Sequence, residues 1–138
     1  MKNIWNLALM AVCVFGMTAC SDDDNDKPII DPVDPVVVNG VYVLSQGNYY
    51  SALNGDLTVY NPSTSDYTNG IFASVNERAL GGTANDAVVY GSKLYIANTD
   101  ENVLEVADAK TVKSIKQLPL SGARRIIADG GFLYVTSF

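Results

Sequence analysis

Apolar and polar residues alternate along three short stretches of the chain that resemble one another. The stretches are residues 40–45, 93–98 and 132–137, and Tyr42, Tyr95 and Tyr134 hold the same place in them. β-Branched and aromatic side chains alternate with small or polar ones, a pattern that predicts a strand burying one face. The chain therefore repeats a strand, with 39 residues between Tyr95 and Tyr134.

The repeat extends beyond these strands in both directions. Residues 85–92 align with 124–131, and residues 55–64 align with 102–111 at an interval of 47 residues. Glycines punctuate the aligned segments, as expected for tight turns between strands. We predict strands over 87–90, 94–98, 103–107 and 112–118, and then over 125–128 and 133–138. A repeat of about 40 residues built from short strands and turns indicates propeller blades of four strands each.

The predicted fold is therefore all-β, a partial β-propeller of about two and a half four-stranded blades over residues 39–138. Helix is nearly absent from this prediction, and only residues 112–118 could form a brief helical turn instead of an outer strand. In the first blade, residues 35–45 form either one bulged strand or a tight hairpin around Asn39 and Gly40. Because propellers close with about 4–8 blades, we expect the chain to be a fragment of a longer protein.

The first 38 residues are predicted to contain an export signal followed by a flexible tether. Residues 1–19 combine Lys2 with an apolar run over 7–17 and small residues before Cys20, which is typical of a signal peptide. Residues 17–20, Met-Thr-Ala-Cys, resemble a bacterial lipobox, which implies cleavage before Cys20 and a lipid anchor on its thiol. The alternative is an ordinary secretory peptide. Residues 20–38 are acidic and proline-rich, and are expected to form a solvated tether.

Charge is concentrated in that tether. It holds six Asp against Lys27, whereas residues 39–138 hold nine acidic and seven basic side chains. The nearly neutral folded part argues against nucleic acid and anionic bilayers as partners. The acidic run after Cys20 resembles a signal that sends lipoproteins of some Gram-negative gut bacteria to the cell surface. A spacer on a periplasm-facing lipoprotein is the alternative, and a calcium site in this run is disfavoured because it lacks fixed geometry.

Several kinds of catalytic chemistry are missing from residues 39–138. The whole chain has no His, and its Trp5 and Cys13 lie in the predicted signal peptide. Cys/His and Ser/His arrangements and zinc sites of His or Cys are therefore excluded within this stretch. Adjacent Asp100 and Glu101 are interpreted as a solvated turn rather than an acid/base pair. We expect no enzyme activity, no cofactor and no metal from these residues.

Ligand binding is the function class that remains, and the loops that could bind a ligand lie at one end of the predicted sheets. In a four-stranded meander successive loops fall at alternate ends, so loops 45–55, 79–86, 98–102 and 118–125 should share one face. The first loop is six residues longer than its counterpart, and its tyrosines offer flat contact area to a large ring or a sugar. One tyrosine could instead pack inward while the other covers the hairpin. The two arginines could hold a phosphate or carboxylate, or pair with Asp86 or Glu77. The candidate binding residues are Gln46, Asn48, Tyr49, Tyr50, Asn85, Asn98, Arg124 and Arg125.

Two sequence motifs resemble known families. Residues 133–137, Leu-Tyr-Val-Thr-Ser, are similar to the repeat of YVTN-type (YncE-like) propeller surface lipoproteins. Residues 43–49, 57–60 and 84–86 resemble the seven-bladed, cobalamin-binding lipoproteins of the BtuG type. This resemblance implies a non-enzymatic binder on the outer membrane, exposed at the cell surface, that captures a nutrient for an outer-membrane transporter. A cobalamin-like corrinoid is the leading candidate ligand, with a glycan or a partner protein behind it. The alternative is a propeller enzyme, a hydrolase or quinoprotein-like oxidoreductase, with its catalytic residues in further blades.

Overall fold

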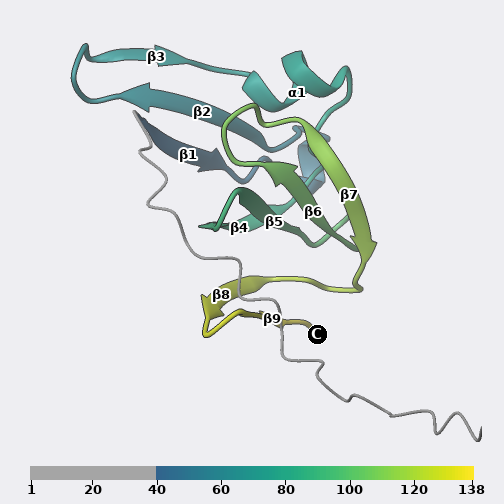
Figure 1. Cartoon of the computed structure of the whole chain (residues 1–138). Helices are drawn as coiled ribbons and strands as arrows, with labels where there is room; N and C mark the ends of the chain where they lie inside the picture. The colour runs from purple at the N-terminus through teal and green to yellow at the C-terminus, as the bar shows by residue number, and fades with distance from the viewer. Residues whose placement is uncertain (1–39) are drawn as a thin grey trace, which may run out of the picture.

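The chain folds into three antiparallel β-sheets that follow one another in sequence. The computed structural model describes residues 40–138, so the predicted signal peptide, Cys20 and the tether lie outside the described residues. None of the sheets closes on itself. Figure 1 shows the three sheets arranged in chain order, with β1–β3 above, β4–β7 in the middle and β8–β9 below. The all-β prediction is confirmed for the part of the chain that is described.

The first sheet contains β1 (Val41–Ser45), β2 (Asp56–Asn61) and β3 (Asp66–Thr68), in that order. Val41 lies opposite Tyr60, and Tyr60 lies opposite Tyr67. Facing residues in an antiparallel pair point to the same side, so these three side chains share one face. The strand predicted near residues 35–45 thus begins at Val41 in the described chain, and what precedes Gly40 lies outside it.

The second sheet is a four-stranded meander of β4 (Ala84–Tyr90), β5 (Lys93–Asn98), β6 (Val103–Asp108) and β7 (Ser114–Pro119). All four predicted strands are confirmed, with β4 starting three residues earlier than expected. The outer strand was predicted from Val112, and this boundary is wrong. Val112 is fully buried with a left-handed φ of 60°, and its N–H donates to the Asp108 carbonyl. It belongs to the turn, which places its side chain in the core.

The third sheet is the hairpin of β8 (Arg125–Asp129) and β9 (Phe132–Thr136). It repeats the first hairpin of the second sheet: Tyr90 pairs with Lys93 across two residues, as Asp129 pairs with Phe132. Gly91 and Gly130 have φ values of 59° and 57°. These left-handed conformations favour glycine. The glycines are therefore the reason that both turns could be predicted from the sequence.

Helix is present where none was predicted. The α-helix α1 (Ile71–Asn76) follows the first sheet, and a short 3₁₀-helix, η1 (Tyr49–Ser51), lies in the β1–β2 loop. α1 is too short for its own hydrogen bonds to stabilise it, so it depends on packing. Phe72 is fully buried, and Asn76 Nδ2 donates to the Val112 carbonyl at 2.9 Å. Val112 lies 36 positions after Asn76 in the sequence. The local sequence around α1 therefore does not reveal this contact.

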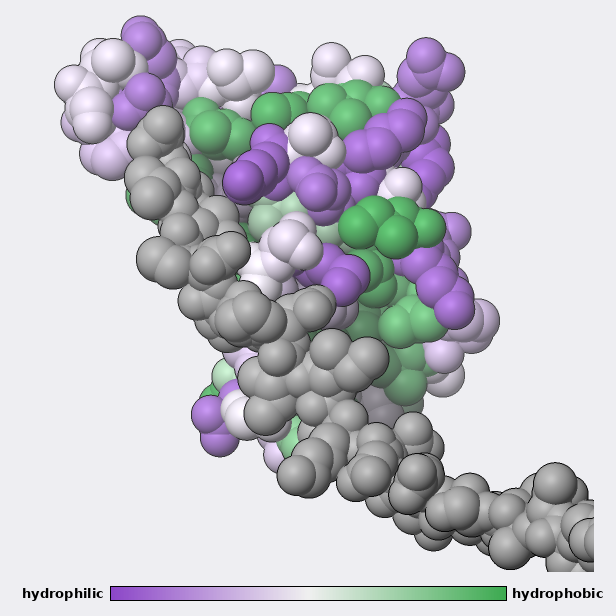
Figure 2. All heavy atoms as spheres, viewed as in Figure 1, coloured by the Kyte–Doolittle hydropathy of each residue, from purple (hydrophilic) through white to green (hydrophobic). Residues whose placement is uncertain are grey.

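Two apolar clusters hold the sheets together. One lies between the first and second sheets around Leu57, Phe72, Leu94 and Ile96. The other lies between the second and third sheets around Ala97 and residues that include Leu104, Ala123, Leu133 and Val135. The outward faces of the first and third sheets keep exposed apolar side chains, namely Val41, Val43, Tyr60, Tyr67, Ile127, Phe132 and Tyr134. Figure 2 likewise shows hydrophobic residues lying between hydrophilic ones on the surface facing the viewer. No helix in residues 40–138 has the length and apolar character needed to cross a bilayer.

Candidate functional site

Four loops meet at one end of the sheets, as the alternating connections of a meander require. Backbone hydrogen bonds join them: Gly55 donates to Gly81 at 2.6 Å, Ala84 to Gln46 at 3.2 Å, and Thr99 to Thr83 at 3.0 Å. The Leu120 N–H also donates to the Asn102 carbonyl at 2.8 Å. The predicted common face of the loops is therefore present.

A chain of side-chain hydrogen bonds crosses this end from the first sheet to the third. Gln46 Nε2 donates to Asn85 Oδ1 at 2.6 Å, and Asn85 Nδ2 donates to Thr99 Oγ1. Thr99 Oγ1 in turn donates to the Ala123 carbonyl at 2.6 Å. Asn85 uses its amide oxygen and its amide nitrogen on opposite sides, so it fixes the Gln46 side chain relative to the second sheet. Two of the predicted binding residues are thereby brought into direct contact.

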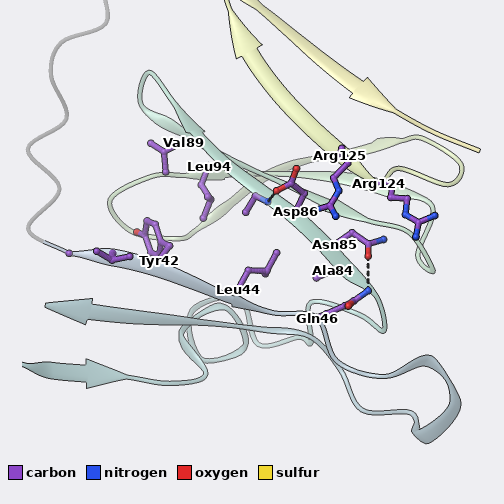
Figure 3. A pocket seen from close by; sticks show the side chains of 13 residues that line it. Tyr42, Leu44, Gln46, Ala84, Asn85, Asp86, Val89, Leu94, Arg124 and Arg125 are labelled. Carbon is purple, nitrogen blue, oxygen red and sulfur yellow. Dashed lines mark hydrogen bonds between the residues drawn. The ribbon is translucent and has the colours of Figure 1, made fainter. Parts of the chain in front are cut away.

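A cavity of about 760 Å³ lies between β1 and β4 and opens beside these two amides. Figure 3 shows Tyr42, Val89 and Leu94 at one end, and Gln46, Asn85 and Arg124 at the other, where Arg125 also lies nearby. We call Gln46, Asn85, Arg124 and Arg125 the polar rim. Its four members were all predicted as binding residues, and they come from three segments far apart in the sequence.

The polar rim carries positive charge without an internal ion pair. The alternative in which Arg124 or Arg125 pairs with Asp86 or Glu77 is not observed: within residues 40–138 the one ion pair joins Arg78 to Glu105 at 2.8 Å. Asp86 instead accepts from two backbone amides, those of Ala87 at 3.0 Å and Ile126 at 2.9 Å. The Arg124 guanidinium lies over the Phe138 ring, 5.4 Å from its centroid. Both arginine side chains are exposed.

The long β1–β2 loop is ordered by its own backbone. Asn48 and Leu53 exchange two backbone hydrogen bonds, and Asn48 Oδ1 accepts from the Tyr50 N–H at 2.9 Å. A Cβ at Gly47, whose φ is 77°, would collide with the Leu53 carbonyl oxygen. Asn48 therefore caps η1, a structural role. Tyr49 opens η1, and the Tyr50 side chain is 95% exposed.

Asn98 lies apart from the other predicted site residues. Its side chain is fully buried, its Nδ2 donates to the Leu80 carbonyl, and its Oδ1 has no partner. It ties the loop before β4 to the end of β5 rather than lining the cavity.

Sequence reasoning missed two other polar groupings. Glu105 is buried and its carboxylate accepts from Arg78, Ser114 and Gln117. Tyr42 donates from its hydroxyl to the Ala109 carbonyl at 2.6 Å, and burial, together with the nearby Asp108 charge, raises the pKa of its phenol. Glu105 lies on the inner strand β6, and its partners come from β7 and from the segment after α1, so no local sequence pattern indicated this grouping. No set of acidic, His or Cys side chains in residues 40–138 could hold a metal ion.

Comparison with known proteins identifies a family without supplying an activity. The family model described as "Domain of unknown function (DUF5074)" matches residues 39–128, more than half of the chain. No curated protein matches the chain.

Proposed function

The chain belongs to the DUF5074 family, and we propose that it is a non-enzymatic, lipid-anchored surface protein that binds a small molecule at the polar rim. Its sheets are consecutive blades of a propeller of the YVTN type. The ligand is a scarce nutrient, with a cobalamin-like corrinoid as first candidate, passed on to an outer-membrane transporter.

One observation carries this proposal: four predicted binding residues gather at the mouth of a single cavity. A hydrogen bond of 2.6 Å joins the side chains of Gln46 and Asn85, so their amides are partly oriented before a ligand arrives, which lowers the entropy lost on binding. The cavity volume, about 760 Å³, falls within the range of about 300–1,000 Å³ typical of small-molecule sites. Small-molecule sites usually combine apolar side chains with a few converging polar groups, and this cavity has both kinds, with Leu44, Val89 and Leu94 lining it beside the polar rim.

The chemistry of the rim suits a large, amide-bearing ligand. Carboxamides both donate and accept hydrogen bonds, and guanidinium groups bind phosphate or carboxylate in pairs of bonds. A corrinoid is a macrocycle fringed with carboxamides and carrying a phosphate, so it presents both partner types. Glycans lack the phosphate, and would use the amides and the exposed Tyr50 alone.

The test is a calorimetric titration of the whole chain with cyanocobalamin and then with neutral oligosaccharides. The double variant Gln46→Ala/Asn85→Ala should weaken binding at least about fivefold, because both amides line the mouth. Lys116→Ala, on the far strand β7, should leave the affinity unchanged. A wild-type chain that binds neither class of ligand, or a double variant that binds as tightly as wild type, would overturn the site.

The exposed loop offers a second prediction. Replacing both Tyr49 and Tyr50 by Ala should weaken ligand binding by at least about 1 kcal/mol, roughly fivefold, if these rings provide contact area. The free energy of unfolding should hardly change, because a loop tip adds little to the core. Calorimetry measures the affinity and urea denaturation measures the stability. Unchanged affinity would mean that this loop only covers the hairpin.

The anchor is tested separately from the site. Cells expressing the chain should incorporate radioactive fatty acid into it, and Cys20→Ser should abolish the label. Protease added to intact cells should digest the labelled protein if it is displayed on the surface. Complete protection would place it on the periplasmic side.

A further inference from the structure

β4 contains a β-bulge at the polar rim. Ala84 pairs with Asn98 and Asp86 pairs with Ala97, which leaves Asn85 as an extra residue without a partner on β5. The alanines on either side of Asn85 and Asp86 both pack at the cluster between the first and second sheets. The extra residue thus lets two consecutive polar side chains turn away from that cluster. Bulges commonly re-aim a side chain in this way next to a functional site.

Asp86 uses this position to hold a segment of the third sheet. Its Oδ2 accepts a hydrogen bond from the Ile126 N–H at 2.9 Å, 40 residues further along the chain. Three residues earlier in that segment, the Ala123 carbonyl accepts from Thr99 Oγ1 at 2.6 Å. Two side chains, one from β4 and one from the loop after β5, therefore hold residues 123–126 at both ends. Both arginines of the polar rim lie between these two hydrogen bonds.

The Asp86 carboxylate makes no ion pair with these arginines. Each of its oxygens accepts instead from a backbone amide, that of Ala87 at 3.0 Å and that of Ile126. Asp86, Arg124 and Arg125 all line the cavity, and Figure 3 shows their side chains around it. A charged acceptor forms stronger hydrogen bonds than a neutral one. Asp86 therefore fixes the backbone that carries the guanidinium groups and leaves those groups available to a ligand.

We infer that Asp86 is a positioning residue for an anion-binding half of the site, in which Arg124 and Arg125 hold a phosphate or carboxylate group of the ligand. This inference rests on the proposed binding site at the polar rim. Guanidinium groups bind such anions by paired hydrogen bonds, and a fixed backbone beneath them lowers the entropy lost on binding.

The other half of the site is formed by Gln46 and Asn85, whose amides serve neutral hydrogen-bonding groups. The two halves together define the ligand class. It is an anionic molecule that carries carboxamide or hydroxyl groups near its charge. A neutral oligosaccharide lacks the group that the arginines would hold.

Titration of the full chain with inorganic pyrophosphate, followed by NMR at low ionic strength, tests the anion-binding half without a corrinoid. In the wild type the amide signals of Arg124 and Arg125 should shift as pyrophosphate is added. Asp86→Ala should weaken this binding at least about fivefold, because the arginines lose their fixed backbone. Charge alone predicts the opposite, since removing a carboxylate beside two arginines should strengthen the binding of an anion. The sign of the change therefore separates positioning from simple electrostatics.

Asp129→Ala is the matched control, because it removes the same charge from an exposed side chain at the other end of β8. It should not weaken pyrophosphate binding. Asp86→Asn keeps a hydrogen-bond acceptor and should weaken binding less than Asp86→Ala does. The side-chain amide signals of Gln46 and Asn85 should stay unchanged in Asp86→Ala, since a general loss of structure would move them as well.

Two results would overturn the inference: no shift at the two arginines in the wild type, or an Asp86→Ala variant that binds pyrophosphate as tightly as wild type or more tightly. The amide half could then still bind a neutral ligand. If the β5 amides of Asp86→Ala show that the fold is lost, Thr99→Val removes the other hydrogen bond to residues 123–126 and should weaken binding in the same direction. A chain that binds pyrophosphate as expected but not cyanocobalamin would overturn the corrinoid proposal and leave this inference standing.

Discussion

Asp108 shows how one side chain can determine a turn. Its Oδ1 accepts from the Lys110 N–H at 3.0 Å, the Thr111 N–H at 2.8 Å and the Thr111 hydroxyl at 2.9 Å. These bonds satisfy donors that the chain reversal between β6 and β7 leaves free. Asn61 does the same in the first sheet, where its Oδ1 accepts from the Ser63 N–H at 2.9 Å. Both turns could be predicted from the sequence, because each begins with an Asp or an Asn.

The charge of Asp108 should make this turn sensitive to pH. Hydrogen bonds from Thr111, first from its backbone and then from its hydroxyl, together with that from the Lys110 N–H, lower the pKa of the Asp108 carboxyl below its ordinary value. A carboxyl whose folded-state pKa is lowered stabilises the fold fully above its unfolded-state pKa. That stabilisation is lost as the pH falls through the folded-state value. Wild type should therefore exceed Asp108→Asn in stability at pH 7, and the difference should vanish in strong acid.

Urea denaturation of both proteins between pH 7 and pH 2 measures this difference. Thr111→Val removes only the hydroxyl donor, so its comparison with wild type should show the same trend with smaller amplitude. A gap between wild type and Asp108→Asn that is constant over the whole pH range would contradict the assignment.

At the scale of single elements, α1 is the piece that joins the first sheet to the second. Ser114 donates from its backbone to Asn76 Oδ1 at 2.8 Å, and Lys113 Nζ donates to the Val75 carbonyl at 3.2 Å. Just beyond the helix, Arg78 pairs with buried Glu105 and also lies over the Phe72 ring, 4.9 Å from its centroid. The helix is therefore fixed by contacts with β6, β7 and the turn between them.

The Phe72→Ala variant should show how much this helix contributes to the free energy of unfolding. The ring is fully buried in the cluster between the two sheets, so its removal leaves a cavity and should cost about 3–5 kcal/mol of unfolding free energy. Ser74→Ala on the exposed side of α1 should change stability by less than about 0.5 kcal/mol. Urea denaturation compares the two variants, and similar values for both would show that α1 is not a structural joint.

The strands were predictable and the helix was not, for a physical reason. Alternation along residues 94–98 reports a local property, the burial of one face, and the glycines at 91 and 130 report a local φ requirement. α1 has the sequence Ile-Phe-Ala-Ser-Val-Asn, whose β-branched residues favour strand. The hydrogen bonds that join it to the second sheet go to Val112, Lys113 and Ser114, which lie 36 to 38 residues further along the chain. Similarly, Asn98 looked like a loop ligand because it ends a strand, whereas the packing of the loop before β4 buries it. The contact of Gln46 with Asn85 depends on side-chain conformations across 39 residues, which no spacing rule supplies.

At the scale of the whole molecule, equivalent positions in the repeat differ in burial. Val41 and Leu94 occupy the same place in their stretches, yet Val41 is 51% exposed and Leu94 is 1% exposed. Within residues 40–138, only the second sheet has neighbours on both faces. The exposed faces of the first and third sheets thus correspond to surfaces that the second sheet buries.

This difference yields a paired test. Leu94→Ala should cost about 2–5 kcal/mol, as truncation of a fully buried leucine does. Val41→Ala should stay within about 0.5 kcal/mol, since its side chain gains little from folding. Denaturant midpoints at several protein concentrations give both values. A comparable cost at Val41 would reveal that the outer face of the first sheet is covered in solution.

The hydrogen bond between α1 and a distant residue also determines when the contacts of this helix can be completed during translation. Val112, whose carbonyl receives the Asn76 amide, lies 36 residues further along the chain. At ribosomal rates of about 5–20 residues per second, the Asn76 amide waits roughly 2–7 seconds for this partner. Phe72 packs in a cluster that includes Leu57, which is synthesised before it. Packing of α1 against the first sheet can therefore begin during synthesis, whereas its hydrogen bond to the turn before β7 forms only when the second sheet is nearly complete.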